Sequence, residues 1–364
     1  MLEIQKFLRS HYDDWEETLT APPYSLSIKK KNGLVLFNYN NYSSERGNKI
    51  VQEARGLILE EKSWEVVRIG FTRFFNIGEE DVDDIDWSNS IGTEKLDGTL
   101  IFIYHYKGWH IGTRSTFDAE DAPLNSSSFK NYKELFDFVA ATRYPDFCID
   151  NLDKQFTYCL ELCSIYNQSV VIYNEPQLWH ILTRSNNNMC REVDMEIGIP
   201  KPIKYICNSK EEYEKVVKNF DKTHEGIVVK DYNGRRVKIK TESYFELHKK
   251  ACNGHINKAK AIELIITGES SEFLSYFPQY RDYFKNISKE LKRQLIVVYH
   301  IQRRVNWWKY FSPNCGRKEF AEWVSKYLQE WSNIAFLAYE ERMFDMLATK
   351  DAKKLMKLLH IKED

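Results

Sequence analysis

The segment 225–240 constrains the fold of this chain more than any other. Its sequence, EGIVVKDYNGRRVKIK, places an Asn-Gly pair at 233–234 between two runs that are rich in β-branched residues. An Asn-Gly pair in that setting is the strongest short-range signal for a β-hairpin. The segment therefore predicts two antiparallel strands and, with them, an antiparallel sheet.

This hairpin would gather charge where a core strand carries apolar groups. If the turn has two residues, Lys238 pairs with Val229. Lys240 then pairs with Ile227, and paired residues point to the same side of a sheet. Glu225, Lys238 and Lys240 would share one face, which suits phosphate oxygens and Mg²⁺. A solvent-facing hairpin with surface charges explains the same pattern and, taken alone, is the commoner case.

A second motif, EKLDGT at 94–99, comes directly before an apolar run. Its Gly98 would let a ligand approach the backbone closely. Lysine acts as a nucleophile only when positive neighbours or burial favour its neutral amine, so Lys95 would need such surroundings. Alone, the motif is also an ordinary turn into a strand.

The rest of the chain predicts an α+β fold in two parts. Short β-branched and aromatic runs predict strands over 99–105, 109–113, 156–162, 169–173, 226–230 and 235–240. A helix is expected over 211–220. From about residue 250 the pattern is helical, with apolar stripes at Leu291, Leu295, Val298, Val305 and Trp308, and at Phe320, Trp323, Val324, Tyr327 and Leu328. We place the boundary between domains 1–250 and 251–364.

Composition excludes several classes of protein. Hydrophobic residues make up 43% of the 364 residues, which excludes a disordered chain. No apolar run is long enough to span a bilayer and the N-terminus is acidic, so we expect a soluble cytosolic protein. The seven cysteines show no CxxC pair, which favours buried free thiols over zinc.

The charge is uneven along the chain. Overall it is −1, but residues 251–364 carry 19 Lys and Arg against 14 Asp and Glu, a net charge of +5. This excess indicates a basic surface for a polyanion or, equally, ordinary solvated helix faces.

Four ordered motifs resemble those of a known superfamily. Lys95-x-Asp97-Gly98, Glu161 in YCLEL, EGIVVK at 225–230 and KIK at 238–240 occur in the order and rough spacing of motifs I, III, IV and V of the covalent nucleotidyltransferases. These enzymes include ATP-dependent DNA and RNA ligases and mRNA capping enzymes. Within them the chain resembles the family of the first RNA ligase of T-even bacteriophages. The supporting segments are ARGLI at 54–58, RFFN at 73–76, KIKTESYFELH at 238–248 and, weakly, NCGRK at 314–318.

The resemblance implies a nucleotidyltransferase domain of antiparallel sheets with flanking helices, followed by an all-helical domain that selects the RNA. It also implies a three-step sealing reaction with ATP and Mg²⁺ and with Lys95 as the nucleophile that carries AMP. Lys238 and Lys240 would hold the α-phosphate and orient pyrophosphate. Glu225 would position the metal, and Glu161 would contact the ribose or the metal shell.

The resemblance assigns further contacts with ATP. Arg55 and Arg73 would contact the triphosphate or the 5′-phosphate of the RNA, Gly98 would pass close to the sugar, and Glu94 would present its backbone to adenine. Arg73 and Arg114 stand where the phage enzyme has lysines. Both keep a positive charge, so both would still contact phosphate of ATP, but Arg offers a planar fork in place of a point charge.

The implied partner is RNA with 5′-phosphate and 3′-hydroxyl ends, with nicked tRNA favoured and no membrane. Whether a kinase or phosphatase partner prepares those ends is left open. The expected compartment is the cytoplasm, which would be that of the host if the protein is viral.

For Trp179 and His180, core packing is favoured over base stacking. Core packing is also expected of four tail tryptophans, Trp307, Trp308, Trp323 and Trp331.

Two rival functions share these motifs. A DNA ligase or capping enzyme would follow motif V with an OB-fold of short strands, whereas this tail is helical. A catalytically silent protein that binds RNA ends would keep the fold but not the chemistry. Every charged residue that the chemistry needs is present, which disfavours a catalytically silent protein.

Overall fold

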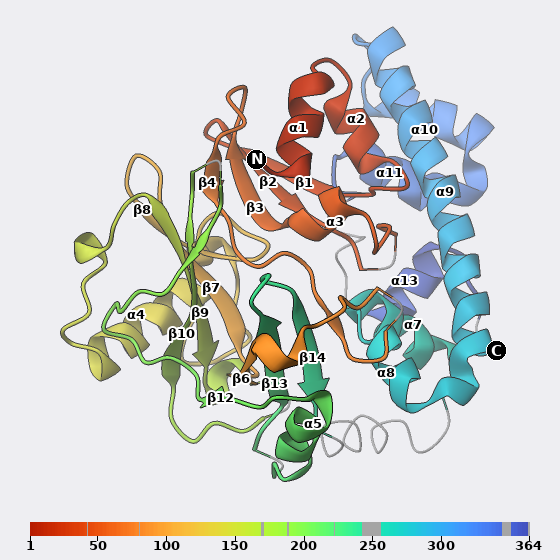
Figure 1. Cartoon of the computed structure of the whole chain (residues 1–364). Helices are drawn as coiled ribbons and strands as arrows, with labels where there is room; N and C mark the ends of the chain where they lie inside the picture. Colours follow the sequence, from red (N-terminus) through yellow and green to blue (C-terminus); the bar gives the residue numbers. More distant parts are fainter. Residues whose placement is uncertain are drawn as a thin grey trace. The chain divides into compact units, whose positions relative to one another are not determined.

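The computed structural model describes residues 1–364 except 42, 80, 169–170, 188, 222, 242–255, 344–350 and 363–364. The chain, shown in Figure 1, divides into two compact units. The first comprises Met1–Asn40 and Ser44–Lys249, and the second comprises Asn41–Ser43 and Lys250–Asp364. The buried apolar cluster of the second unit shares no residue with those of the first.

The first sheet is antiparallel and follows chain order. Its strands are β1 (Ser27–Lys31), β2 (Leu34–Asn38), β3 (Arg55–Glu60) and β4 (Val66–Arg68). Three short helices lie along it in Figure 1, namely α1 (Glu3–Ser10), α2 (Trp15–Thr20) and α3 (Lys49–Glu53). Ile4 and Leu8 of α1 pack against Val35 and Phe37 of β2, which anchors the N-terminus on this sheet.

The second sheet has the order β11-β10-β9-β7-β8, and all its pairs are antiparallel. Its strands are β7 (Thr99–His105), β8 (Trp109–Thr113), β9 (Phe156–Cys163), β10 (Gln177–Ser185) and β11 (Glu192–Val193). Helix α4 (Tyr132–Arg143) buries Leu135 and Val139 against Ile101 and Leu160. The strands predicted over 99–105, 109–113 and 156–162 are confirmed.

The strand predicted over 169–173 is wrong for the described residues 171–173, and 169–170 lie outside the described part. The backbone N–H of Val171 donates to Asp97 Oδ2 at 2.7 Å. The Tyr173 hydroxyl accepts from the backbone N–H of Asp97 at 2.9 Å. The β-branched run thus bonds to the turn that follows Lys95 and not to a neighbouring strand.

The third sheet has the order β12-β6-β13-β14-β5. Its strands are β5 (Phe75–Asn76), β6 (Ser90–Lys95), β12 (Lys204–Tyr205), β13 (Gly226–Asp231) and β14 (Arg236–Lys240). Only the β14–β5 pair is parallel. Helix α5 (Lys210–Lys218) packs its Tyr213 and Val217 against Ile227 and Val237 of this sheet, which confirms the predicted hairpin strands and helix.

The predicted register of the hairpin is wrong by one residue. Lys238 pairs with Val228 and Lys240 with Gly226, because the turn holds three residues and not two. Gly234 is in the left-handed region at φ +82°, and Arg235 O accepts from Asp231 N–H across the turn. A turn with a left-handed third residue is the next commonest hairpin connection after the two-residue type.

The second unit is helical, and its described residues contain no strand. Its helices are α7 (Lys258–Thr267), α8 (Ser270–Tyr276), α9 (Arg281–Phe311), α10 (Arg317–Tyr327), α11 (Ser332–Tyr339) and α13 (Ala352–Leu358). Short 3₁₀ helices complete the described chain at Trp87–Asn89, Ala119–Asp121, Ile149–Asn151, Ile165–Asn167, Pro278–Tyr280 and Gln329–Trp331. The expected α+β class, with antiparallel sheets followed by helices, is confirmed.

The apolar stripes of the tail are only partly buried. Trp308, Trp323 and Trp331 pack against the core of the second unit as expected. Trp307 is 63% exposed, so the expected core packing is wrong for this residue. Tyr327, in the second stripe, is 51% exposed.

The cysteines are free thiols in the described part of the chain. Cys159, Cys163, Cys190 and Cys207 are buried, but Cys148 and Cys315 are exposed, contrary to the expectation of burial; Cys252 lies outside the described residues. Among the helices that the structure describes, none is both long and apolar enough to span a bilayer.

Candidate active site

Lys95 lies where the chain crosses from the third sheet to the second. Strand β6 ends at Lys95, and β7 begins at Thr99. Between them the backbone N–H of Gly98 donates to Glu161 Oε1 of β9 at 3.2 Å. A Cβ on Gly98 would lie 2.5 Å from Leu162 O, so glycine is required here for close packing against β9. The strand before Lys95 and the turn after it are therefore both anchored.

Glu225 binds two lysines in a buried position. Its Oε2 accepts from Lys95 Nζ at 2.5 Å, and its Oε1 lies 2.8 Å from Lys240 Nζ. Burial raises the pKa of Glu225, but the charges of Lys95 and Lys240 lower it by more, so that the net shift of the pKa is downward. The carboxylate therefore stays charged and holds both lysines at one point.

Gly226 explains how Glu225 reaches the lysines although the predicted register is wrong. Gly226 pairs with Lys95 on one side and with Lys240 on the other. Its φ is +150°, and a Cβ there would meet Ile239 O at 2.1 Å. This backbone conformation interrupts the alternation of the strand, so Glu225 lies with the lysines and not with buried Ile227.

Glu161 provides a second carboxylate from β9. Burial raises its pKa to about 7, opposed by the charge of Lys95 and reinforced by that of Glu225. Trp179 pairs with Glu161 across β9 and β10, and its buried Nε1 has no hydrogen-bond partner. Buried His180 bonds to Thr183 at 2.7 Å. His180 is buried as core packing requires, although its Nδ1, like Trp179 Nε1, has no hydrogen-bond partner within the described residues.

Lys238 connects the lysine cluster to a group of arginines. Its pKa is lowered to about 8 by burial and then by the nearby charges of Lys95 and Lys240. Arg55 also contributes to this shift. The Lys238 ammonium lies 4.8 Å from the ring centre of Phe74 and has no carboxylate partner within the described residues.

Tyr39, just after β2, lies at the centre of this arginine group. Arg73 and Arg114 each place a guanidinium carbon 4.2 Å from the centre of its ring. Burial raises the pKa of Tyr39, but Arg114, Arg55, Arg73 and Lys238 outweigh it and lower the pKa to about 7. The chain has 22 tyrosines, and nothing in the sequence distinguishes Tyr39 from the others. The sequence analysis therefore missed it.

The arginines carry donors that nothing in the described protein satisfies. Arg55 Nη1 and Arg73 Nη1 are buried and have no hydrogen-bond partner among the residues that the structure describes. Burial lowers the pKa of Arg73 to about 10, and it also lowers that of Arg114. Buried donors of this kind are costly unless an acceptor is supplied. An anion with several oxygens, such as a triphosphate, would supply it.

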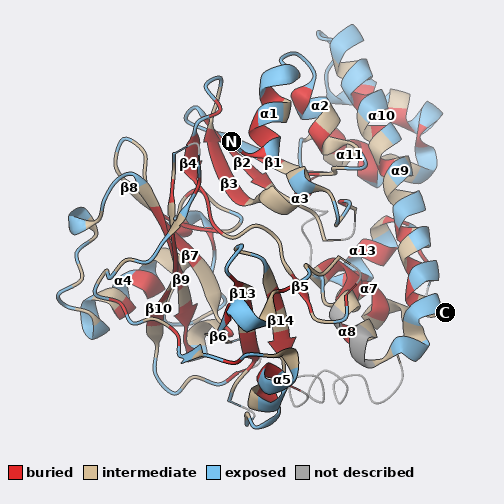
Figure 2. Ribbon diagram, in the orientation of Figure 1, coloured by how far each residue is buried: buried red, intermediate tan, exposed pale blue. Residues whose placement is uncertain are grey.

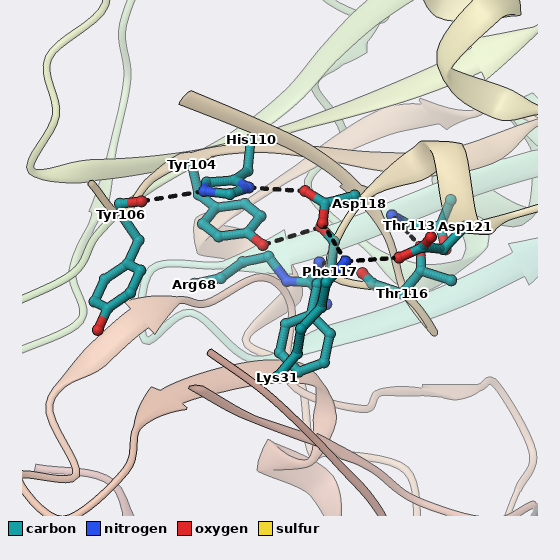
Figure 3. Close-up of polar contacts among 10 residues, drawn as sticks. All are labelled: Lys31, Arg68, Tyr104, Tyr106, His110, Thr113, Thr116, Phe117, Asp118 and Asp121. Carbon is teal, nitrogen blue, oxygen red and sulfur yellow. Dashed lines mark hydrogen bonds and ion pairs between the residues drawn. The ribbon is translucent and has the colours of Figure 1, made fainter. Parts of the chain in front are cut away.

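Arg68, which is fully buried, binds the backbone next to Arg55 and Arg114. Arg68 Nε donates to Gly56 O at 2.9 Å, and Arg68 Nη1 donates to Thr116 O at 2.8 Å. Gly56 directly follows Arg55, and Thr116 lies two residues after Arg114. Figure 3 shows Arg68 beside the polar network of the 113–121 loop. Arg68 therefore ties together the backbone segments that carry Arg55 and Arg114.

The 113–121 loop is anchored mainly through Asp118. Its carboxylate binds His110 Nδ1 at 2.7 Å and Lys31 Nζ at 2.9 Å (Figure 3). The Tyr104 hydroxyl donates to Phe117 O at 2.9 Å. The loop is thus held at three points in addition to Arg68.

Most of the expected site residues are brought together. Contacts or direct electrostatic interactions connect the set Lys95, Glu161, Glu225, Lys238, Lys240, Arg55, Arg73 and Arg114. Glu94 is directed differently, with Oε1 3.8 Å from His224 Nε2 and its backbone N–H bonded to Ile203 O. Residues 242–248 of the longest motif lie outside the described part of the chain.

The acidic side chains fit a metal only together with a phosphate. No group of three or more His, Cys, Asp and Glu in the described residues could hold a metal ion by itself. Mg²⁺ usually binds one or two carboxylates together with substrate phosphates and water. Glu225 and Glu161 suit that arrangement beside a cluster of cations.

Comparisons with known proteins agree with this site. Residues 53–245 match the sequence profile of a family described as RNA ligase. A protein of Autographa californica nuclear polyhedrosis virus, named as a bifunctional polynucleotide kinase/RNA ligase, is 32% identical over 280 residues; the match covers 72% of this chain and 40% of that protein. An RNA ligase of Rhodothermus phage RM378 is 26% identical, over 50% of this chain and 48% of that protein. The chain therefore covers less than half of each relative.

Among solved structures, an archaeal ATP-dependent RNA ligase is similar with a TM-score of 0.43. Its sequence is 12% identical, and the match covers 96% of this chain and 83% of that chain.

Proposed function

Because the chain belongs to the RNA ligase family that includes the first RNA ligase of T-even bacteriophages, we propose that it is an ATP-dependent RNA ligase. It joins an RNA 5′-phosphate to an RNA 3′-hydroxyl, and nicked tRNA is the proposed substrate. The observation that carries the proposal is the contact of Lys95 and Lys240 with the buried carboxylate of Glu225, near two arginines whose Nη1 donors have no acceptor within the described residues.

In the first step Lys95 becomes joined to AMP. The neutral amine, after its ammonium has lost a proton to water, attacks the α-phosphorus of ATP. A P–N bond forms and the nitrogen loses a second proton to water, the bond from the α-phosphorus to the bridging oxygen breaks, and pyrophosphate leaves. Lys238 and Lys240 neutralise charge on the α-phosphate and the leaving group.

In the next two steps AMP activates the RNA and then leaves. An oxygen of the RNA 5′-phosphate attacks the α-phosphorus, and Lys95 is released. The 3′-hydroxyl of the other end then attacks the 5′-phosphorus, a phosphodiester bond forms, and AMP departs. The buried Nη1 donors of Arg55 and Arg73 support binding of the triphosphate first and of the 5′-phosphate later.

The remaining roles follow the same geometry. The guanidinium groups of Arg73 and Arg114 both lie against the ring of Tyr39. Arg114 would therefore contact the same phosphates as Arg73. Glu225 and Glu161 would hold Mg²⁺, which neutralises phosphate charge when bound. Gly98 and the backbone of Glu94 would lie by the sugar and adenine. The free thiols of the described cysteines support a reducing compartment, the cytoplasm.

The test is transfer of label from ATP labelled on the α-phosphate. We expect denaturing electrophoresis to show label on the wild-type protein in Mg²⁺ and none on Lys95→Ala. Lys62→Ala, at an exposed position, is the matched control and should be labelled like wild type. No label on wild type after pyrophosphate has removed any bound AMP would overturn the proposal and favour a protein that only binds RNA ends.

A further inference from the structure

The longest helix of the second unit has two opposite faces. On α9, the residues Phe284, Ile287, Leu291, Val298, Ile301 and Val305 are buried. On the other side, seven exposed residues follow at alternating spacings of four and three, Lys289, Arg293, Ile296, His300, Arg303, Trp307 and Tyr310. We call these seven residues the α9 surface. Such spacing places side chains on one face of a helix, and Figure 2 shows the exposed side of α9 in pale blue.

The α9 surface carries three cations, Lys289, Arg293 and Arg303, and no acidic residue. The helix carries eight Lys and Arg but only two acidic residues, Asp282 and Glu290. Glu290 is paired with Lys258 of α7 at 3.1 Å, and Asp282 precedes the surface. Lys285 and Lys292 are exposed beside it. A row of cations over a helix of this length attracts a polyanion.

Aromatic side chains are exposed at the C-terminal end of the same helix. Trp307, Tyr310 and Phe311 are 63%, 79% and 73% exposed. Phe311 contacts both other rings edge to face, at centroid distances of 6.3 Å and 5.1 Å. Large exposed aromatic groups beside cations are the combination that proteins use to stack unpaired bases while holding the backbone.

We propose that the α9 surface binds single-stranded RNA, namely an unpaired segment of the RNA that the enzyme seals. The cations hold consecutive phosphates, and Trp307 and Tyr310 stack on unpaired bases. The surface extends over 22 residues, about 32 Å between its ends at the rise of an α-helix, which accommodates several nucleotides. The inference rests on the proposed function, since it identifies where the RNA substrate of that same reaction is held.

A protein partner fits these residues less well. Spacings of four and three are also those of a coiled-coil seam, but such a seam would bury Lys289 and Arg293 against another helix. Burying charged side chains in a helix interface is costly, whereas the phosphates of RNA carry the opposite charge. A second protein chain is therefore an alternative outcome of the test.

The test measures RNA binding by the full chain. The probe is a fluorescent RNA hairpin with a break in its loop that leaves 5′-phosphate and 3′-hydroxyl ends. Because one stacked base contributes about fivefold or more in affinity, Trp307→Ala with Tyr310→Ala should raise the Kd at least fivefold. Arg293→Ala with Arg303→Ala should lower the slope of log Kd against log salt by about 1.4, at about 0.7 for each phosphate contact.

Matched controls lie in the same unit but off the α9 surface. Tyr327→Ala removes an exposed aromatic group from α10, and Lys353→Ala with Lys354→Ala removes two exposed cations from α13. Both controls should bind the probe within twofold of wild type. All variants should still attach AMP to Lys95, which separates this inference from the proposed function.

Wild-type affinity and salt slope in both α9 variants would overturn the inference. So would an effect of the controls as large as that of the α9 variants. If the α9 variants change only the sedimentation of the protein and leave RNA affinity unaltered, the surface binds protein and the inference is wrong. Failure of wild type to attach AMP while RNA binding still depends on the α9 surface would instead contradict the proposed function alone.

Discussion

Lys95 and Glu225 are 130 residues apart in the chain, and the partly exposed ammonium of Lys95 forms an ion pair with the buried carboxylate of Glu225 at an N–O distance of 2.5 Å. Glu225 is only 2% exposed and binds Lys240 as well. The third sheet makes this contact, since Gly226 pairs with both Lys95 and Lys240. The relationship defines the candidate active site and gives the first prediction.

Glu225→Gln should abolish AMP attachment and lower the free energy of unfolding by about 3 kcal/mol. The substitution keeps the shape but leaves two lysines facing a neutral amide, and loss of one partner from a buried ion pair costs about 3–5 kcal/mol. Urea unfolding and the ATP label measure the two effects. Glu214→Gln, which breaks an exposed pair with Lys210 on α5, should change stability by less than about 0.5 kcal/mol. Equal stabilities of the two variants would contradict the prediction.

The KM for ATP should rise as the pH increases through about 8. The pKa of Lys238 is about 8, so above that pH its amine becomes neutral and attracts phosphate less. The rise is at most about tenfold per pH unit for binding linked to one proton. Lys238→Arg stays charged and should flatten the profile of KM against pH.

Tyr39 is the control for that profile, because its pKa of about 7 makes it anionic over the same range. Tyr39→Phe removes this second titration and should leave the rise above pH 8 in place. A flat profile in Tyr39→Phe would assign the effect to the tyrosine and not to Lys238.

Arg68→Met should raise the KM for ATP about tenfold, equivalent to 1.4 kcal/mol. The change removes both hydrogen bonds that hold the backbone beside Arg55 and Arg114. Arg68→Lys should recover only part of the effect, because one ammonium cannot reproduce the fork of a guanidinium. Lys31→Ala removes a β1 cation that binds Asp118 and Asp121 of the 113–121 loop, without touching Gly56 or Thr116, and should leave the KM within twofold of wild type. An equal KM for Arg68→Met and wild type would refute the positioning role.

Glu192→Gln should destabilise the protein by about 3 kcal/mol at neutral pH and by little at pH 2. Burial raises the pKa of Glu192, but Arg236 and Lys230 outweigh it and lower the pKa from 4.5 to about 2. A lowered folded pKa gives stability that is complete above about pH 4.5 and disappears as the pH falls toward 2. The difference in unfolding free energy between wild type and variant should narrow over that window. A difference independent of pH would contradict this account.

Several elements could be predicted from local sequence. Alternating and β-branched runs identified β7, β8, β9, β13 and β14, because a strand must present one face to a core at every second residue. The run 169–173 has the same composition, yet its described part bonds to the Asp97 turn. Local composition cannot show which acceptor a backbone N–H will find.

The residues of the candidate active site could be predicted only partly from the sequence. The motif order identified Lys95, Glu161, Glu225 and Lys240 as candidates, and they meet. The hairpin argument reached that result through a wrong register, and Gly226 compensates through its positive φ. Arg68 went unnoticed, since a buried arginine that binds only carbonyl oxygens leaves no pattern along the chain.

The sequence by itself determined which residue types were available and in which order: a lysine before Asp-Gly, two lysines at every second position of a strand, and a basic helical tail. Local propensity and motif spacing are properties of neighbours along the chain, so they can be read there. Only the tertiary structure decided that Tyr39 lies among three arginines and that Trp307 of α9 is exposed. Burial and electrostatic surroundings depend on segments far apart in sequence, which only the packing of strands and helices brings together.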